Sequence, residues 1–348
     1  MARLLITGGA GYIGSHCAVV LSEIGHQIVL YDNFSNSDPA VLENLALLVG
    51  QRIPFVNGDV RNTELLASTL TSQSIDAVIH FAGLKAVGES VEKPIEYYAN
   101  NVQGAINLLQ AMQSAQIKTL LFSSSATIYG EPQYLPLDEN HPTCAMNPYG
   151  RSKLYVEEML NDVAASDPEW RIACLRYFNP VGAHESGLIG DCPSGPPNNL
   201  MPYIAQVAAG ARTHLNVFGN DYPTMDGTGV RDYIHVMDLV EGHVAALTYI
   251  MQTTGWHAFN FGTGKGHTVL ELVDAFQRAS GRNVPYQIIA RRQGDAAECY
   301  ASPNKSEKLL SWKAKRTLDD MCISAWKFQE KAIRDQRKTA FENLNTFE

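Results

Sequence analysis

The chain has 348 residues, of which 45% are hydrophobic and 18% charged, so it can bury a large core and is unlike disordered, collagenous or coiled-coil sequences. Its formal net charge of -9 gives no electrostatic reason to expect nucleic acid or an anionic membrane as a partner. The six cysteines show neither a C-x-x-C pair nor zinc-finger spacing, which favours reduced thiols and no metal site. Without a membrane-span or signal-peptide pattern, we expect a cytoplasmic protein.

Short apolar runs alternate with helix-length amphipathic stretches in the first half of the chain. The predicted strands are Arg3–Thr7, Gln27–Tyr31, Ile53–Val56, Ala77–Phe81, Thr119–Ser123 and Arg171–Arg176, with a helix from Pro148 to about Ala165. Repeated strand–helix units form parallel sheets, and nearly continuous apolar strands indicate helices on both faces. The sequence therefore predicts an α/β protein with a doubly wound parallel sheet, the Rossmann fold.

The pattern changes after residue 180. Residues 182–197 are rich in Gly, Pro, Ser and Asn, which predicts a long loop. The elements expected beyond it are helices near Leu200–Ala209, Val236–Ile250 and Thr268–Ser280 and a strand at Gln287–Ile289. We expect a nucleotide-binding domain over residues 1–180, to which later segments can return, and a smaller substrate-binding lobe over 181–348. The charged residues from about Glu330 predict a fraying polar tail.

Three glycines follow the first predicted strand as G-x-x-G-x-x-G. Gly8, Gly11 and Gly14 stand where a strand ends and a helix begins, so the backbone can approach a pyrophosphate at the positive end of that helix. By itself the pattern is equally consistent with a tight turn. Asp32 at the end of the second strand supports a dinucleotide, since an acidic residue there binds the ribose hydroxyls and repels a 2′-phosphate. This favours NAD over NADP, although the neighbouring Asn33 weakens the preference.

The third and fourth strands also end in polar or glycine-bearing segments. Asp59, in the segment Gly-Asp-Val, could reach the edge of an adenine. His80 precedes Phe-Ala-Gly and has apolar neighbours, so we expect a hydrogen-bonded core histidine rather than a functional one.

Tyr149 and Lys153 are four residues apart at the start of a predicted helix, and therefore lie on one face. A tyrosine can accept a proton at neutral pH only if its phenolate is stabilised, which an adjacent lysine and the positive nicotinamide of oxidised NAD would do. The hydroxyls of Ser123–Ser125 could donate to the same substrate oxygen, as alcohol oxidation by hydride transfer requires. Each feature alone is also consistent with a surface pair or a serine-rich turn.

Long segments carry a resemblance to a known family. They are Thr7–Gly14, His80–Ser90, Ser123–Gly130, Tyr149–Lys153, Leu175–His184, Pro197–Gln206, Phe218–Leu239 and Arg291–Asp295. Over nearly its whole length the chain resembles the UDP-hexose 4-epimerases, a family of extended short-chain dehydrogenases/reductases. The resemblance implies an isomerase that interconverts UDP-glucose and UDP-galactose through a transient 4-keto sugar, with NAD retained between the half-reactions.

The resemblance also implies site residues. The catalytic residues would be Ser125, the base Tyr149 and its helper Lys153. The residues implied to bind NAD are Gly8, Gly11, Tyr12, Ile13, Gly14, Asp32, Asn33, Asn36, Ser37, Asp59, Val60, Phe81, Ala82, Gly83, Lys85, Asn100, Ser123, Tyr149, Lys153 and Tyr177. Those implied to bind the UDP-sugar are Lys85, Ser125, Tyr149, Tyr177, Phe178, Asn179, Asn199, Leu200, Asn216, Phe218, Arg231, Arg292, Asp295 and Cys299.

These substrate residues suit a UDP-sugar chemically. Arg231 and Arg292 could neutralise a diphosphate, and Asn179 and Asn199 could hydrogen-bond phosphate or sugar. Asp295 could accept from the uridine ribose. Taken singly, the two arginines would more often be solvated surface charges.

Related enzymes of this fold dehydrate or decarboxylate nucleotide sugars through the same keto intermediate. In the family, dehydratases carry Asp-Glu and decarboxylases a Glu just after the catalytic Ser or Thr, where this chain has Ala126 and Thr127. Neither side chain can perform that proton transfer, which favours an epimerase. The remaining alternatives are UDP-uronate or UDP-pentose epimerisation, and a non-catalytic NAD-binding scaffold, which would be expected to lack one of the catalytic residues.

Cys299 bears on substrate range. Family members restricted to UDP-glucose and UDP-galactose have a bulky Tyr at this position, so a small side chain is expected to admit UDP-GlcNAc and UDP-GalNAc as well. A one-residue shift in register would place Tyr300 there instead, and Cys299 would then be a small buried hydrophobe.

The family is commonly homodimeric. The helices around Pro94–Gln116 and Val156–Val163 have apolar positions suited to an interface, which by periodicity alone could equally face the core.

Overall fold

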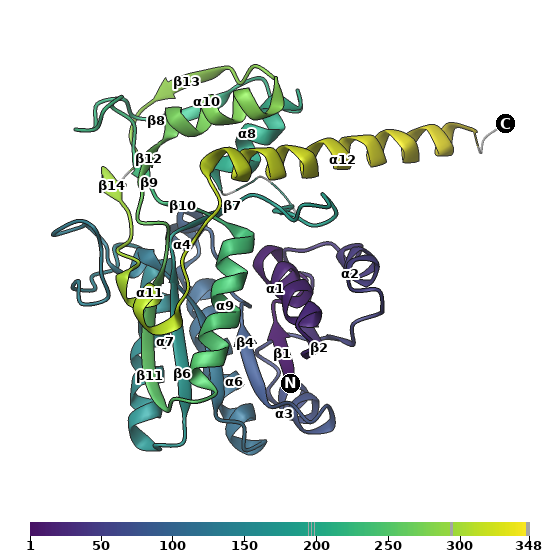
Figure 1. Ribbon diagram of the computed structural model, residues 1–348, viewed down its shortest axis with the longest axis vertical. Helices are drawn as coiled ribbons and strands as arrows, with labels where there is room; N and C mark the ends of the chain where they lie inside the picture. The colour runs from purple at the N-terminus through teal and green to yellow at the C-terminus, as the bar shows by residue number, and fades with distance from the viewer. Residues whose placement is uncertain (194, 196, 198, 293–294, 346–348) are drawn as a thin grey trace.

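The computed structural model describes residues 1–193, 195, 197, 199–292 and 295–345; the remaining positions of the expected loop and of the family segments lie outside the described residues. A seven-stranded parallel sheet, in the order β11-β6-β5-β4-β1-β2-β3, fills the lower part of Figure 1. Its strands are β1 (Arg3–Thr7), β2 (Gln27–Asp32), β3 (Phe55–Asn57), β4 (Ala77–His80), β5 (Thr119–Ser125), β6 (Arg171–Tyr177) and β11 (Gly255–Phe261). The order reverses between β1 and β4, which confirms the predicted doubly wound fold.

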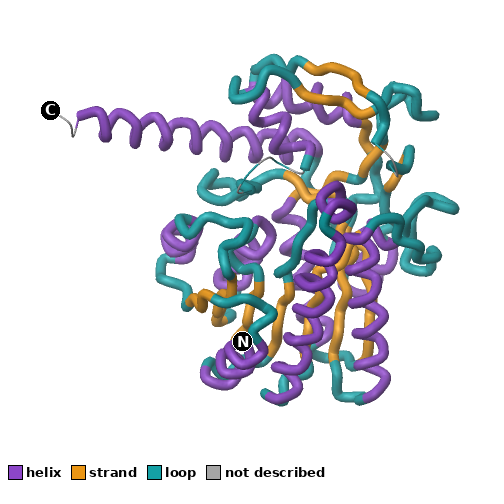
Figure 2. The backbone as a smooth tube through the Cα atoms, turned by 180° about the vertical axis from the view of Figure 1, so that it is seen from behind, coloured by secondary structure: helices purple, strands orange, loops and turns teal. Residues whose placement is uncertain are grey.

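Helices cover both faces of this sheet (Figures 1 and 2). Leu4 and Ile6 of β1 pack into one core with α1, α2 and α9, while Leu5 between them packs into a second core with α3, α6 and α7. Alternate residues of one strand thus reach opposite cores, which is why the strand is apolar throughout. The helices are α1 (Tyr12–Glu23), α2 (Val41–Val49), α3 (Thr63–Ser72), α6 (Gln103–Ser114), α7 (Pro148–Ser166) and α9 (Val236–Ile250).

Two features of the large sheet differ from the sequence expectation. The third strand begins at Phe55 rather than Ile53, because Pro54 has no N–H to donate to a ladder. The last strand, β11, pairs in parallel with β6 although it comes from the second half of the chain. Segments from both sides of residue 180 therefore build the sheet.

The smaller lobe lies above the carboxyl edge of the sheet in Figure 1 and has its own core. Ile204 of α8 (Leu200–Ala208), Phe276 of α10 (Val269–Ser280) and Cys322 of α12 (Leu318–Asn345) are fully buried there. The short strands pair in three small sheets, β10-β7, β12-β9-β14 and β13-β8. They are β7 (Asn179–Val181), β8 (Leu215–Phe218), β9 (Val230–Arg231), β10 (Tyr233–His235), β12 (His267–Thr268), β13 (Tyr286–Ile289) and β14 (Glu298–Cys299). The remaining short helices are α4 (Val87–Glu92), α5 (Pro94–Tyr97), a π-helical turn (Tyr98–Val102), a 3-10 turn (Ala126–Ile128) and α11 (Asn304–Leu310).

The expectation of a fraying tail from Glu330 was wrong. Helix α12 continues through this stretch to Asn345 and projects from the body of the molecule (Figure 1). The stretch contains no Gly or Pro and is rich in Lys, Arg, Glu, Gln and Ala, which favour helix even without a packed face. Among the described residues, no helix combines the length and apolar character needed to cross a membrane.

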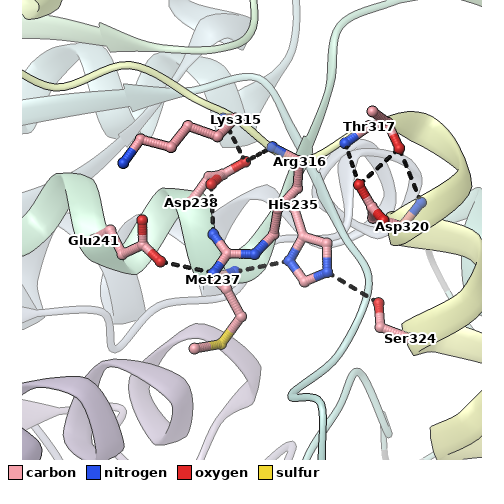
Figure 3. A network of polar contacts seen from close by, with 9 residues as sticks. All are labelled: His235, Met237, Asp238, Glu241, Lys315, Arg316, Thr317, Asp320 and Ser324. Carbon is pink, nitrogen blue, oxygen red and sulfur yellow. Dashed lines mark hydrogen bonds and ion pairs between the residues drawn. The ribbon is translucent and has the colours of Figure 1, made fainter.

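A polar network fastens helix α9 of the sheet domain to the segment that leads into α12 (Figure 3). The carboxylate of Asp238, which is fully buried, accepts hydrogen bonds from the backbone N–H groups of Lys315 (3.1 Å) and Arg316 (2.8 Å) and forms an ion pair with the Arg316 guanidinium. At the start of α9, the ring of His235 lies 3.0 Å from the hydroxyl of Ser324 in α12. These contacts fix the smaller lobe over the sheet edge.

We expect Asp238→Asn to lower the free energy of unfolding by about 2–4 kcal/mol, because it leaves the Arg316 guanidinium and two backbone donors without their charged acceptor. Urea denaturation measures this loss. Arg278→Gln, which breaks the exposed pair with Asp319, serves as the control and should cost about 0–1 kcal/mol. Equal stability of the two variants would show that the network does not hold the lobes together.

Candidate active site

The glycine loop after β1 is shaped by close backbone contacts. A Cβ atom on Gly8, whose φ is +69°, would lie 2.6 Å from the Ala82 nitrogen at the end of β4. A Cβ on Gly14 would lie 2.2 Å from the Gly8 carbonyl oxygen. Gly11 is the N-cap of α1, and the first turn of that helix has neither a capping side chain nor an acidic residue. The free N–H groups and positive end of α1 therefore face whatever occupies the loop, as a pyrophosphate site requires.

Asp32 lies where β2 ends, beside this loop. Its carboxylate accepts hydrogen bonds from the backbone N–H groups of Ala10 (3.0 Å) and Phe34 (2.8 Å), so it also braces the loop. Asp59 does not face the same space. Its carboxylate pairs with Arg61 at 2.7 Å and accepts from Asn33, and the hydrogen bond from Arg61 lowers the pKa of Asp59 to about 2.

The histidine that ends β4 is structural. His80 is buried, and its Nδ1 lies 2.7 Å from the Thr7 hydroxyl in β1. Burial lowers its pKa to about 3, so it stays neutral. The interpretation of His80 as a hydrogen-bonded core residue is confirmed.

The start of α7 presents Tyr149 and Lys153 to the sheet edge. Pro148 occupies the first helical turn, and the side chain of Asn147 caps the helix by accepting from the Gly150 N–H at 2.8 Å. The Lys153 ammonium is buried and donates to the Ser123 carbonyl at 2.7 Å. Burial lowers the pKa of Lys153 to about 8.

Tyr149 and Ser125 meet at the carboxyl edge, where β5 ends. Burial raises the pKa of Tyr149, and a hydrogen bond with Ser125 opposes that rise. The Ser125 hydroxyl also accepts from the hydroxyl (2.9 Å) and the backbone N–H (3.2 Å) of Thr127. In the sequence, Thr127 served only to show that a dehydratase's or decarboxylase's acidic residue is missing. In the structure, its hydroxyl and backbone N–H orient the Ser125 hydroxyl.

A cavity of about 1260 Å³ joins the glycine loop, this tyrosine–lysine pair and the smaller lobe. Ligand sites typically measure roughly 300–1,000 Å³, so two ligands can lie side by side. Asp59 and Cys299 do not line it. The lining residues predicted for the cofactor are Gly8, Gly11, Tyr12, Ile13, Gly14, Asp32, Asn33, Asn36, Ser37, Val60, Phe81, Ala82, Gly83, Lys85, Asn100, Ser123, Tyr149, Lys153 and Tyr177. Those predicted for the substrate are Lys85, Ser125, Tyr149, Tyr177, Phe178, Asn179, Asn199, Leu200, Asn216, Phe218, Arg231, Arg292 and Asp295.

Cations line the cavity despite the negative net charge of the chain. Arg231 comes from β9, and Arg292 lies 4.6 Å over the ring of Phe218 while pairing with Asp295 at 2.9 Å. Lys85 follows β4. This arrangement suits a ligand that carries several phosphate charges.

Asp191, in the long loop, was not predicted as a site residue but lies among these groups. Its carboxylate accepts from Asn199 at 2.9 Å and lies 3.6 Å from the Lys85 ammonium. The loop carried no periodic pattern in the sequence, so only the fold brings this carboxylate to the cavity.

The residues at the glycine loop fit a dinucleotide. A backbone cradle that excludes any Cβ, an uncapped helix start and a buried carboxylate at the end of β2 match the requirements of a pyrophosphate and an adenosine ribose. Within the described part of the chain, no three His, Cys, Asp or Glu side chains are grouped as metal ligands.

Comparisons with known proteins agree with this geometry. Residues 5–324 match the family model described as GDP-mannose 4,6 dehydratase. The chain is 52% identical over 330 residues to the UDP-glucose 4-epimerase of Bacillus subtilis, covering 95% of this chain and 97% of that relative.

Solved structures show the same likeness. The UDP-glucose 4-epimerase of Stenotrophomonas maltophila, with bound NAD and formylated UDP-arabinopyranose, superimposes with a TM-score of 0.94 at 50% identity and covers 96% of this chain and 100% of that one. The enzyme of Bifidobacterium longum, in complex with NAD+ and UDP, gives a TM-score of 0.92 at 50% identity and covers 94% and 98%. The chain belongs to the UDP-glucose 4-epimerase family of the extended short-chain dehydrogenases/reductases.

Proposed function

We propose that this protein interconverts UDP-glucose and UDP-galactose by inverting C4 of the sugar, with NAD held in the same cavity throughout. The observation that carries the proposal is the placement of Ser125, Tyr149 and Lys153 on the wall of a cavity that also contains the glycine loop. A NAD-dependent isomerase needs its proton acceptor beside both the cofactor and the substrate. One cavity that holds both ligands supports this.

The cofactor would lie along the glycine loop. Gly8, Gly11 and Gly14 would receive its pyrophosphate at the start of α1, and Asp32 would accept from the adenosine ribose. Bound NAD supplies the hydride acceptor and donor for C4. Lys153 joins the start of α7 to the end of β5, next to the cofactor site, through its hydrogen bond to the Ser123 carbonyl.

Tyr149 is proposed as the proton acceptor. It would take the proton of the sugar 4-hydroxyl while Ser125 donates a hydrogen bond to the same oxygen. Burial raises the pKa of Tyr149, so proton transfer requires a positive charge nearby, and the Lys153 ammonium one helical turn away provides it. When C4 regains a hydride on its opposite face, Tyr149 returns the proton, and no net oxidation occurs.

The smaller lobe would hold the UDP moiety. Arg231 and Arg292 lie on the cavity wall where they can pair with a diphosphate, and Asn179 and Asn199 can add hydrogen bonds. With the diphosphate anchored, the sugar can present either face to the reaction centre. Asp295 already pairs with Arg292 and can accept from the uridine ribose.

Tyr149→Phe removes the proton acceptor without removing the ring, so we expect turnover of UDP-galactose to fall by roughly 10²–10⁴-fold. NAD should remain bound, since the glycine loop is unchanged; NMR of the sugar and release of NAD on denaturation measure the two effects. Tyr286→Phe on β13, which is exposed and lies outside the cavity, is the matched control and should keep full turnover. Full turnover of Tyr149→Phe would rule out this residue as the base.

The smaller side chain at Cys299 is proposed to admit N-acetylated sugars. Cys299 pairs with Arg231 between β14 and β9 and packs near Phe178, and both of those neighbours line the cavity. The Cys299 side chain does not itself line the cavity. A tyrosine there is longer, and the proposal is that it would extend past Phe178 or Arg231 into the sugar site. Tyr300 packs against Gly266 instead and does not line the cavity.

We therefore expect Cys299→Tyr to abolish interconversion of UDP-GlcNAc and UDP-GalNAc while turnover of UDP-galactose persists. Separate assays of the two substrate pairs measure this, with Cys299→Ser as the control that keeps both. Equal losses on both pairs in the Tyr variant would contradict a gate at this position.

A second copy of the chain is the proposed partner. Within the predicted helices the apolar stripes face the core, since Leu108 of α6 and Leu160 of α7 are buried. Exposed apolar side chains instead come from three neighbouring helices: Val91 of α4 is 64%, Ile95 of α5 82% and Tyr155 of α7 47% exposed. An α4–α5–α7 surface of this kind suits a homodimer.

Sedimentation tests the homodimer. The wild-type chain should sediment at twice its 38.2 kDa mass, and Ile95→Glu, which places a charge on the α4–α5–α7 surface, should give the single mass. A monomeric wild-type protein at micromolar concentration would contradict the proposed partner.

The cysteines of the described residues are all free thiols, and three of them, Cys17, Cys174 and Cys322, are buried. Free thiols are typical of a reducing compartment, which supports a cytoplasmic location. Fractionation of the source cells tests this, and recovery outside the cytoplasm would contradict it.

A further inference from the structure

A buried ion pair joins α7, the helix that carries Tyr149 and Lys153, to β6, the strand next to β5. Glu157 of α7 and Arg176 of β6 have side chains that are 3% and 5% exposed, and the Arg176 Nη2 lies 2.7 Å from a Glu157 carboxylate oxygen. The Arg176 Nε lies 3.2 Å from both oxygens of the same carboxylate. Three contacts between two planar groups give this pair a fixed geometry.

Glu157 contacts both elements that carry the catalytic residues. It lies one helical turn after Lys153 on α7, and it accepts a hydrogen bond from the hydroxyl of Ser124. Ser124 stands between Ser123, whose carbonyl accepts from Lys153, and the catalytic Ser125. One carboxylate therefore links the helix to the strand at the level of the catalytic groups.

Arg176 extends the link to two further strands. Its Nη1 donates to the Tyr129 hydroxyl at 3.0 Å, and that hydroxyl donates to the Asn260 side chain of β11 at 2.6 Å. Arg176 itself immediately precedes Tyr177, which lines the cavity. The pair is thus connected to β5, β6, β11 and α7 at once.

Holding two charges in the core has a cost that an apolar pair of similar size would avoid. Stability alone therefore does not account for Glu157 and Arg176. The hydrogen bond from Ser124 to Glu157 and the one-turn spacing of Glu157 from Lys153 point to a role in the site.

We propose that the Glu157–Arg176 pair positions Lys153 and Ser125 and balances the electric field at the Lys153 ammonium. The proposal rests on the proposed epimerase function for the roles of those two residues. Glu157 and Arg176 do not line the cavity and act through their neighbours, so they are positioning residues.

The other ionisable groups around Lys153 are uncharged near neutral pH. Burial lowers the pKa of His80 in β4 to about 3, and burial raises the pKa of Tyr149 in α7 and of Tyr177 in β6. Tyr97 from α5 interacts with Tyr149, and burial raises the pKa of Tyr97. The further ionisable groups near the ion pair are Tyr129 and Glu139 from the segment between β5 and α7, Cys174 from β6 and Lys305 from α11. Glu157 raises the pKa of Lys153 against the effect of burial.

Neutralising Glu157 and Arg176 in turn distinguishes an effect of charge from an effect of packing, because the two variants change the local charge in opposite directions. Glu157→Gln leaves the Arg176 charge unbalanced, which disfavours the Lys153 ammonium and should move the alkaline limb of kcat to lower pH by about one unit. Arg176→Gln leaves the Glu157 charge unbalanced, which favours the ammonium and should move that limb to higher pH by about one unit. A purely structural pair would give both variants the same change.

Two readouts keep this test independent of the proposed function. NMR titration of the Lys153 amine in the same variants reports the two shifts whether or not the protein turns over UDP-galactose, while the pH profile of kcat links them to catalysis. Shifts of opposite sign in the titration support the pair; unshifted or parallel shifts overturn it. If the titration shifts as expected but the wild-type protein lacks turnover, the epimerase assignment fails instead.

The control pair and a double variant complete the design. The control is Lys118→Gln. Lys118 pairs with Glu169 at the opposite, amino end of β5 and β6, so the pH profile of this variant should match that of the wild type. If a single variant does not fold, Glu157→Gln with Arg176→Gln removes the uncompensated buried charge. The double variant should keep the limb in place and lose kcat several-fold at unchanged KM, because positioning is lost without a net charge change. Wild-type kcat in the double variant would overturn the proposal.

Discussion

The buried ammonium of Lys153 is held by a 2.7 Å hydrogen bond to the carbonyl of Ser123, and the proposed catalytic edge of the sheet depends on this contact. It ties α7 to β5, so that Tyr149 and Ser125, one on each element, meet at the carboxyl edge of the sheet. Burial disfavours the positive charge that a phenolate needs beside it. The Glu157 carboxylate, one turn further along α7, opposes that effect. The helix therefore holds both the positive charge that the proposed proton transfer needs and a carboxylate that favours that charge.

The fold explains why two ligands share one cavity. The strand order reverses between β1 and β4, and the loops there diverge to leave a crevice for a dinucleotide. The smaller lobe covers the same edge and contributes Arg231 and Arg292 to a chain whose net charge is -9. The proposed phosphate site thus depends on local cations rather than on the overall charge of the chain. The Asp238–Arg316 pair fastens the lobe over the sheet.

The sequence predicted where those candidate residues lie whose position depends on local spacing. Gly8, Gly11 and Gly14 follow a strand, and the four-residue interval between Tyr149 and Lys153 places both on one helical face, so both sets were expected at the sheet edge, where they line one cavity. The direction of Asp59 could not be predicted in this way, because its carboxylate turns toward Arg61 two residues later instead of the cavity.

Contacts between distant segments also escaped the sequence analysis. The approach of Asp191 to Lys85 and the pairing of Glu157 with Arg176 each join segments that no periodic pattern relates. The return of later segments to the first domain was allowed for, but β11 was not identified as the strand that returns. The helical extension of α12 was missed for another reason. Its polar residues were interpreted as a solvated tail, whereas their helix propensity and the absence of Gly and Pro favour a continued helix.

The most direct test supplies UDP-galactose deuterated at C4 to the purified protein without added NAD. Because the hydride would leave C4 and return to the same carbon inside the cavity, the UDP-glucose formed should retain the deuterium at C4, as read by NMR. Replacement of the deuterium by solvent hydrogen would mean that C4 loses a proton rather than a hydride. That result, or the absence of UDP-glucose even with NAD added, would contradict the proposed function.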